Sequence, residues 1–356
     1  MTDSVDGIRW KIEELDNEIL DLIEKRMKAA LYMGNEKARK GLPVRNERVE
    51  DQVIERYLER AEGVGISKAA AKEIATILIQ ESVDAQGRLP RPGRRQDILV
   101  IGTGKMGQWF VRFLTGRGHK VNVCDTRPSK ADRSTVSLKV GVRNADMIII
   151  ATPIPSTKQI LEDVLALKPK GTVLDITSIK DSIIPTMRAA AAGGLEVCSI
   201  HPMFGPEASV YNRSIVICDC GSNEAMDKAA GLFDGAGAKM TRMPVEEHDE
   251  LMSYVLGLSH AVNIAFFRTL TKSGKDFGRL DQVSSTTFRS QAATSKRVAN
   301  ESPELYYNIQ HLNPHSKHCL ELFLEAVGDI EAFALDEDEK RFVEMMKEGK
   351  EYFGED

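Results

Sequence analysis

The stretch that decides the fold of this protein is Ile98-Leu99-Val100-Ile101-Gly102-Thr103-Gly104-Lys105-Met106-Gly107. Four consecutive aliphatic residues predict a buried strand, and the glycine pattern GxGxxG follows at once and opens a helix. In this context the first glycine permits a tight turn and the second permits close approach of a pyrophosphate. The third lets helix and strand pack closely. The stretch therefore predicts a dinucleotide site at the N-terminus of a helix.

An acidic residue at the end of the next strand supports this site. Asp125 follows the strand Val121–Cys124 and stands 18 residues after Gly107. A carboxylate there can accept the ribose hydroxyls of NAD and would repel a 2′-phosphate. Arg127, two residues further on, leaves NADP as the alternative. We expect NAD, and the predicted cofactor-binding residues are Gly102, Thr103, Gly104, Lys105, Met106, Gly107 and Asp125.

Further β-rich apolar runs, 147–151 and 172–176, alternate with helical segments. Such runs indicate a parallel sheet covered on both faces. Beyond residue 243 the pattern becomes helical, with apolar residues spread through Leu251–Leu270 and Leu320–Phe333. We expect that helical part to bury its surplus apolar surface in a homodimer.

Residues 8 to 86 have the periodicity of three helices. Apolar residues recur at three- and four-residue steps from Ile8 to Ala30, and a helix of roughly 30 residues would be about 45 Å long. Because two shorter helices cannot cover such a rod, a partner chain is expected. The second helix is predicted from Asn46 to Gly63 and the third from Ser67 to Gln86.

The stretch from Gly87 to Gln96 holds two prolines, two glycines and four arginines and reads as a linker. A solvated connector is favoured there over an anion-binding patch. The predicted fold class is multidomain α + α/β, with a three-helix domain, a Rossmann-type doubly wound parallel sheet and an all-helical substrate and dimerisation domain. Their predicted bounds are 1–87, linker 88–96, 97–243 and 244–356.

The composition limits the possible partners and compartment. The 356 residues carry a net charge of −5, which gives no support for nucleic-acid or membrane-surface binding. The N-terminus lacks the basic start and apolar core of a signal peptide, and no apolar run approaches the ~20 residues of a membrane span. Five cysteines without CxxC spacing indicate neither disulfides nor a zinc site. We expect a cytoplasmic protein that needs no metal.

The segment Ser199-Ile200-His201-Pro202-Met203-Phe204-Gly205-Pro206-Glu207 resembles the active-site segment of prephenate dehydrogenases. The resemblance spans some 250 residues in family order. It extends through Asp175–Lys180, Glu246–Asp249, Leu258–His260 and Arg297–Tyr306. It implies that prephenate gives up a hydride from C4 to NAD while its ring carboxylate leaves as carbon dioxide.

The resemblance also implies roles for single residues. His201 would accept the proton of the C4 hydroxyl, for which an imidazole of ordinary pKa is suited. Ser178 would orient His201 and the nicotinamide, Arg297 would bind a substrate carboxylate, and His260 would lie near the substrate side chain or serve in the core. Weaker matches to substrate-binding residues are Lys180, Glu207 and Arg289, and His248 is expected only to begin a helix.

Residues 8 to 86 resemble the all-helical chorismate mutases along their whole length. That resemblance implies a cage that holds the chorismate dianion for a unimolecular rearrangement. Members of that class interlock two chains, so that the first arginine enters the partner's site. The matching residues are Arg9, Arg26 and Lys37 as cations, Glu50 as acceptor for the ring hydroxyl, and Ser82 and Gln86 on the third helix.

One position departs from the mutase pattern. The family has an arginine immediately before the matched glutamate, and here that position is Val49. Arg48 lies one place earlier, so either the helix start is shifted or the contact is lost. Reduced mutase activity would follow.

Four functional readings remain. The leading hypothesis joins two steps of tyrosine biosynthesis, chorismate to prephenate and prephenate to 4-hydroxyphenylpyruvate. An arogenate dehydrogenase would keep the same site, and a non-catalytic dimerisation or regulatory module could occupy residues 1–86. A generic 3-hydroxyacid dehydrogenase would share only the dinucleotide half, and would not be expected to carry the HPMFGPE segment or Arg297.

Overall fold

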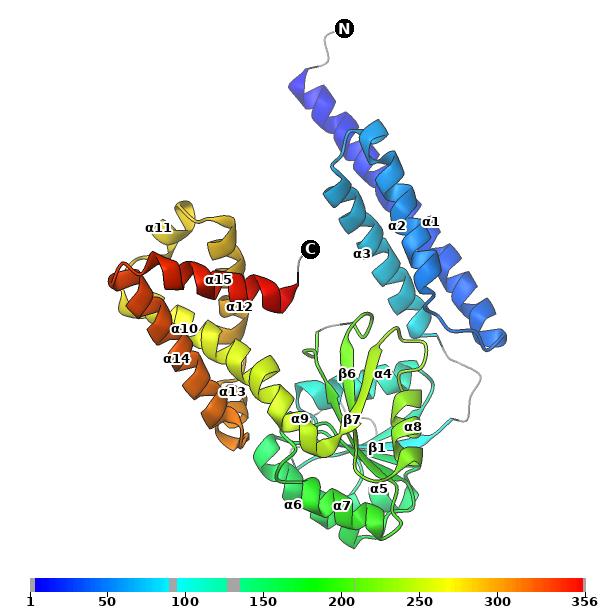
Figure 1. Cartoon of the computed structure of the whole chain (residues 1–356). Helices are drawn as coiled ribbons and strands as arrows, with labels where there is room; N and C mark the ends of the chain where they lie inside the picture. The colour runs from blue at the N-terminus through cyan, green and yellow to red at the C-terminus, as the bar shows by residue number, and fades with distance from the viewer. Residues whose placement is uncertain (1–3, 90–94, 127–134, 208, 355–356) are drawn as a thin grey trace. The chain divides into compact units, whose positions relative to one another are not determined.

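The computed structural model describes residues 4–89, 95–126, 135–207 and 209–354 and divides into two compact units (Figure 1). The first unit contains Met1–Thr177 and Ile183–Pro244, and the second contains Ser178–Ser182 and Val245–Asp356. Two sequence-based expectations, the central part of the linker at 90–94 and the alternative cofactor residue Arg127, lie outside the described residues.

Three long helices form the N-terminal part of the first unit. They are α1 (Val5–Arg39), α2 (Glu47–Ala61) and α3 (Lys68–Gly87). Each begins at a residue whose side chain accepts a backbone N–H of the first turn: Ser4, Asn46 and Ser67. These caps satisfy amides that a helix start leaves unpaired, which is why α2 and α3 begin where the sequence predicts.

The N-terminal half of α1 keeps an apolar face in solvent. In the part of the chain that the structure describes, Ile8, Ile12, Leu15 and Ile19 are between 47% and 56% exposed. At 35 residues the helix is about 52 Å long, more than the 15 and 20 residues of its companions can cover. A contiguous apolar stripe of this size marks an interaction surface.

A seven-stranded sheet forms the rest of the first unit. Its strands are β1 (Asp97–Ile101), β2 (Lys120–Cys124), β3 (Met147–Ile150), β4 (Thr172–Asp175), β5 (Val197–Pro202), β6 (Ser214–Asp219) and β7 (Lys239–Pro244). Its helices are α4 (Lys105–Gly116), α5 (Leu138–Asn144), α6 (Ile154–Ala166), α7 (Ile184–Ala192) and α8 (Asn223–Gly231). On one face, Phe110 of α4 and Ala229 of α8 pack into the same core as Val100 of β1.

The strand order β2-β1-β3-β4-β5-β6-β7 confirms the predicted Rossmann-type sheet. Strands β6 and β7 extend this sheet beyond β5. Strands β1 to β5 are mutually parallel, whereas β6 pairs antiparallel with β5 and parallel with β7. The carboxyl ends of β1 and β5 therefore meet at one edge of the sheet, where open α/β sheets bind their ligands.

The second unit is helical, as the sequence predicts. It contains α9 (Val245–Met252), η2 (Ser253–Leu258), α10 (Ser259–Lys272), α11 (Phe277–Gln282), α12 (Thr286–Ala299), α13 (Pro303–Leu312), α14 (Ser316–Leu335) and α15 (Glu339–Phe353). The η2 segment is a π-helix, and polar side chains bond to its carbonyls. Gln310 donates to Gly257 O at 2.7 Å, and the Cys319 thiol donates to Ser253 O at 3.2 Å.

The run Val245–Lys272 bears on the expectation that no segment spans a membrane. By length and composition alone, these 28 residues could cross a membrane, although the sequence pattern had suggested no such segment. One such helix is weak support for a span, because apolar helices of soluble proteins pass the same test. The run also holds buried His248 and Asp249, a hydrogen-bonded polar pair near its start.

Candidate active sites

The glycine loop has the geometry that a dinucleotide requires. Gly102 has a φ of +97°, and a Cβ on Gly107 would lie 2.0 Å from the carbonyl oxygen of Gly102. Gly104 has open space where its Cβ would point, and it begins α4 without a side-chain cap. The loop thus combines a tight turn and close helix–strand packing with a helix N-terminus that has room for a phosphate.

Asp125 is fixed against this loop. Its Oδ2 accepts hydrogen bonds from the backbone N–H and the hydroxyl of Thr103, both at 2.6 Å. The predicted acidic residue and the predicted loop are therefore brought together, and a negative charge is held at the end of β2.

His201 lies in β5, one residue before the strand ends. It is 4% exposed and its backbone pairs with Val216 of β6. Pro202 follows it and restricts the strand end. The imidazole is therefore held in a dry position at the carboxyl edge that β5 shares with β1 and its glycine loop.

The loop of Ser178 and Lys180 belongs to the second unit and is held by an acidic residue that the sequence reasoning overlooked. Both carboxylate oxygens of Asp249 accept the N–H of Lys180 at 2.9 Å, and Oδ2 also accepts that of Asp181 at 2.8 Å. Burial raises the pKa of Asp249, but these bonds and His248 Nδ1 at 2.6 Å outweigh it and hold the pKa below its usual value. The signal in the sequence is the acidic residue that directly follows His248 in the segment Glu246–Asp249.

The remaining dehydrogenase candidates differ in their surroundings. Arg289 and Arg297 are exposed on α12, and Arg297 Nη2 lies 3.4 Å from the Thr294 hydroxyl. His260, on α10, packs edge-on against the Tyr306 ring, with centroids 4.3 Å apart. Glu207 lines a cavity of 660 Å³ together with residues of α3 and α4. The dehydrogenase candidates are thus divided between the two units.

The helical domain brings most of its predicted residues together. Arg26 donates to Ser82 Oγ and, at 2.6 Å, to Leu78 O, so α1 is tied to α3. Gln86 is buried one turn beyond Ser82, and Gly34 of α1 packs against it. Lys37, close to Gly34 on α1, donates to Val44 O at 2.5 Å. Arg26 is therefore tied to Ser82 of α3, Gln86 packs against the same helix α1, and Lys37 lies further along α1.

Glu50 is held by an arginine other than the two positions considered from sequence. Arg45 Nε lies 3.3 Å from Glu50 Oε2, whereas Arg48 and Val49 are exposed. Helix α2 is capped at Asn46, as predicted, so Arg48 and Val49 both lie in its first turn. Arg45 precedes the helix and therefore lies outside the fixed spacing of a helical motif.

Arg9 does not join this group. It is paired with Asp6 at 3.2 Å, and its side chain is 74% exposed. Because α1 is continuous, the 17 residues between Arg9 and Arg26 separate them by roughly 26 Å along the axis. In this structure, the continuous helix therefore does not bring both arginines of one chain to one small anion.

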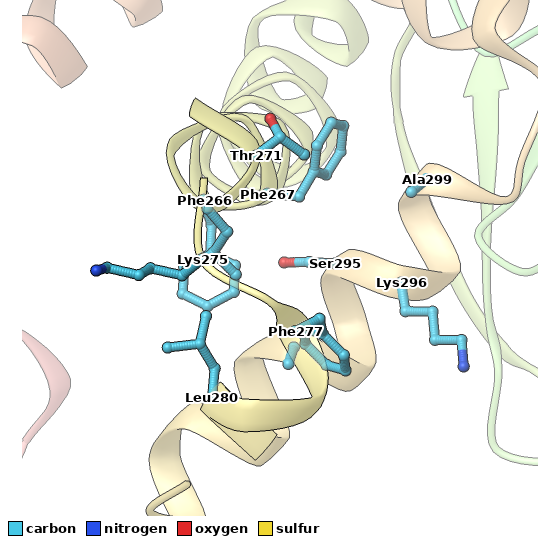
Figure 2. A pocket seen from close by; sticks show the side chains of 11 residues that line it. Phe266, Phe267, Thr271, Lys275, Phe277, Leu280, Ser295, Lys296 and Ala299 are labelled. Carbon is cyan, nitrogen blue, oxygen red and sulfur yellow. The ribbon is translucent and has the colours of Figure 1, made fainter. Parts of the chain in front are cut away.

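An apolar pocket of 290 Å³ lies in the second unit among α10, α11 and α12 (Figure 2). Phe266, Phe267 and Phe277 contribute to its wall, and Figure 2 shows the amino groups of Lys275 and Lys296 pointing away from its centre. Neither Arg297 nor His260 lines it. Burying a carboxylate against such a wall would be costly, so the pocket does not suit an anionic substrate.

Comparison with known proteins gives the same division of the chain. The family model "Chorismate mutase type II" matches residues 8–87. The models "Prephenate dehydrogenase, nucleotide-binding domain" and "Prephenate dehydrogenase, dimerization domain" match residues 113–242 and 244–348.

Similar proteins span the whole chain or its dehydrogenase part. The T-protein of Enterobacter agglomerans is 25% identical over 100% of this chain and 94% of its own length. A probable arogenate/prephenate dehydrogenase of Methanocaldococcus jannaschii is 30% identical over 72% of this chain and 60% of its own length. The crystal structure of prephenate dehydrogenase from A. aeolicus, with hydroxyphenyl propionate and NAD+, superposes with a TM-score of 0.57. It is 21% identical and covers 72% of this chain and 97% of that one, so it supports the fold alone.

The order of the three matched models agrees with the order of the helical domain, the glycine-loop sheet and the second unit. A full-length relative has the same extent. The chain therefore belongs to the family of bifunctional chorismate mutase/prephenate dehydrogenases of tyrosine biosynthesis.

Proposed function

We propose that the dehydrogenase half oxidises prephenate, releases its ring carboxylate as carbon dioxide and forms 4-hydroxyphenylpyruvate. The supporting observation is the buried His201 at the sheet edge that also carries the glycine loop. NAD, when bound, supplies the hydride acceptor. As C4 gives up its hydride, His201 takes the proton of the C4 hydroxyl, and the electrons of the breaking bond to the ring carboxylate complete the aromatic ring. His201 then returns the proton to the phenolate oxygen, so that the product carries a hydroxyl.

The substrate carboxylate needs a cationic partner. Arg297 has an exposed guanidinium on α12, and its planar fork of donors matches a carboxylate. Ser178 orients His201 in this proposal, and Asp249 keeps the Ser178 loop in place through its backbone bonds. Arg289, Lys180 and Glu207 remain secondary candidates for substrate contact.

For the mutase half we propose a cage that works by position and charge alone. Arg26 and Lys37 face the dianion, Gln86 reaches the ether oxygen, and Ser82 holds Arg26. Arg9 of a second chain completes the cage, and preorganised donors then stabilise the charge of the transition state.

One coupled assay tests both halves of the proposal. NADH formation is followed from chorismate and, separately, from prephenate on the purified protein. Formation from both substrates is the expected result. Loss of the chorismate signal alone would mean that the helical domain is a non-catalytic module. A higher kcat/KM for arogenate than for prephenate would instead assign the dehydrogenase to the amino substrate.

Asp125 is expected to set the cofactor preference. The wild-type chain should turn over faster with NAD than with NADP at equal concentration, because the carboxylate at the end of β2 repels a 2′-phosphate. Asp125→Ser should lower kcat/KM for NAD by about 10-fold or more, the scale of a lost charge-assisted bond. Initial rates with each cofactor give the ratio of turnover with NAD to turnover with NADP. Faster turnover of wild type with NADP would show that a neighbouring cation dominates this pocket.

His260 is expected to contribute to the acid sensitivity of the fold. Burial lowers the pKa of His260 from 6.5 to about 4. Between these two pH values the unfolded chain binds a proton that the folded chain does not, so stability falls as the pH is lowered through this window. In this proposal His260 is therefore neutral at pH 7 and meets the substrate as a hydrogen-bonding group.

Thermal unfolding of His260→Gln and wild type at pH 7 and pH 5 tests this. The variant should lose less Tm on acidification than wild type. The exposed His318 provides the matched control, because His318→Gln should behave as wild type does. Equal losses of Tm in wild type and His260→Gln would contradict the assignment.

We further propose that the protein is a cytoplasmic homodimer. The exposed apolar stripe of α1 and the apolar pocket of the second unit both offer surface for a second copy. Burial of the pocket wall would also cover Phe266, Phe267 and Leu270 at the end of the apolar run Val245–Lys272. Light scattering of the purified chain measures its molar mass in solution and therefore its oligomeric state.

A further inference from the structure

The two oxygens of the Glu50 carboxylate have different surroundings. Oε2 accepts the hydroxyl of Tyr211 at 2.8 Å and lies 3.3 Å from Arg45 Nε. Oε1 is buried and has no hydrogen-bond partner among the described residues. One oxygen is therefore used to hold the side chain, and the other is left for a group that the chain itself does not supply.

Tyr211 does not belong to the helical domain. It lies between β5 and β6, and its ring packs into a small core with Val44, Ile79 and Val83. The sheet domain thus reaches into the region of Lys37 and Glu50, across 161 residues of sequence.

The position of Tyr211 is closely defined. Its backbone N–H donates to Ser209 Oγ at 3.0 Å, and Ser209 in turn donates to Asp84 of α3. Gly237 has a φ of +76°, and a Cβ there would lie 2.8 Å from the Tyr211 ring. The Arg45 guanidinium sits over the ring, 5.8 Å from its centroid. Tyr211 is therefore held by its backbone bond to Ser209, by Gly237 beside its ring and by Arg45 over the face of its ring.

In the hydrogen bond between Tyr211 and Glu50, the phenol is the donor and the carboxylate is the acceptor. Burial, followed by the hydrogen bond and charge of Glu50, raises the pKa of Tyr211 well above its ordinary value. The phenol therefore stays protonated and donates, and Glu50 accepts. A carboxylate fixed through one oxygen presents the other in a defined direction, which suits an acceptor for a substrate hydroxyl.

We infer that Tyr211 of the dehydrogenase domain is a positioning residue of the mutase site, and that it aims Glu50 Oε1 at the ring hydroxyl of the substrate. This inference rests on the mutase site proposed above. Arg45 acts with Tyr211 on the same oxygen. The mutase site is then completed by the dehydrogenase domain of its own chain, which gives the fusion of the two enzymes a structural reason.

The test is Tyr211→Phe, which keeps the ring and removes only the hydroxyl. Loss of one charge-assisted hydrogen bond should lower mutase kcat/KM by about 10-fold. The loss should appear mainly as a higher KM for chorismate, because the ring hydroxyl is bound in both ground state and transition state. Dehydrogenase turnover on prephenate, measured on the same sample, should stay at the wild-type level and reports that the chain is folded.

A double-variant cycle separates positioning from general damage. Glu50→Ala should impair the mutase, and adding Tyr211→Phe to it should cause little further loss, because Tyr211 acts through Glu50. Arg117→Gln is the matched control. It removes another bond between the two domains, from Arg117 to Gly87 O at 2.9 Å, without reaching Glu50. Its KM for chorismate should change by less than about two-fold.

Each other outcome has a distinct meaning. Normal mutase activity in Glu50→Ala would overturn the proposed mutase site itself. An impaired Glu50→Ala with a normal Tyr211→Phe would overturn the inference alone. The inference would also be overturned if the double variant lost mutase kcat/KM by the product of the two single losses. It would likewise be overturned if Arg117→Gln lost as much mutase kcat/KM as Tyr211→Phe. In either case Tyr211 would act on the fold and not on Glu50.

Discussion

His201→Asn is expected to lower dehydrogenase turnover by about 100-fold or more, the scale of a lost general base. The structure places this imidazole in β5, 4% exposed, at the carboxyl edge of the sheet. Asparagine preserves a polar group of similar size but cannot accept the hydroxyl proton at neutral pH. The KM for prephenate and the affinity for NAD should change little, because neither carboxylate binding nor the glycine loop involves His201.

Two measurements make this expectation specific. The mutase activity of the same chain should be unchanged, since His201 lies outside the helical domain. Cys198→Ser alters the same strand three residues earlier, inside the core against α8, and should keep turnover within about three-fold of wild type. Near-normal dehydrogenation by His201→Asn would remove the histidine from the mechanism.

The parts of the fold that the sequence predicts are those with local causes. The turn at Gly102, the cap at Asn46 and the cap at Ser67 each depend on a few neighbouring residues, and each is confirmed. The reversed direction of β6 was not predicted. A short apolar run such as Ser214–Asp219 has the same pattern whether its neighbour runs parallel or antiparallel.

The parts of the candidate sites that the sequence missed depend on contacts between distant segments. Asp249 acts on a loop 69 residues away, and Tyr211 meets Glu50 across 161 residues. No periodicity or local spacing contains such a pairing. Arg45 is near Glu50 in sequence, but it lies before the helix and therefore outside the fixed spacing of a helical motif. Only the folded chain shows that these residues act on the predicted ones.

Arg9→Ala and Arg26→Ala are each expected to reduce prephenate formation nearly to the background rate, with the dehydrogenase still working. In both variants the mutase site loses one cationic donor to the bound dianion. Such donors mainly stabilise the transition state, so their loss lowers the rate. The two losses should arise in different chains. Arg26 is tied to Ser82 of its own chain, whereas Arg9 lies roughly 26 Å further along the same helix and is 74% exposed.

Mixing the two inactive variants tests whether two chains build each mutase site. After chain exchange, each mixed dimer should contain one site with both arginines and one site with neither. Because about half of the dimers are mixed and half of their sites are intact, activity should return to about a quarter of the wild-type level. Exchange is verified with a size tag on one variant, and the dehydrogenase rate normalises the amount of folded protein. Mixing Arg26→Ala with a tagged copy of itself is the control and should restore nothing. If exchange is complete and the Arg9→Ala and Arg26→Ala mixture also stays inactive, both arginines serve the same chain, and the exposed stripe of α1 must have a purpose other than an interlocked mutase dimer.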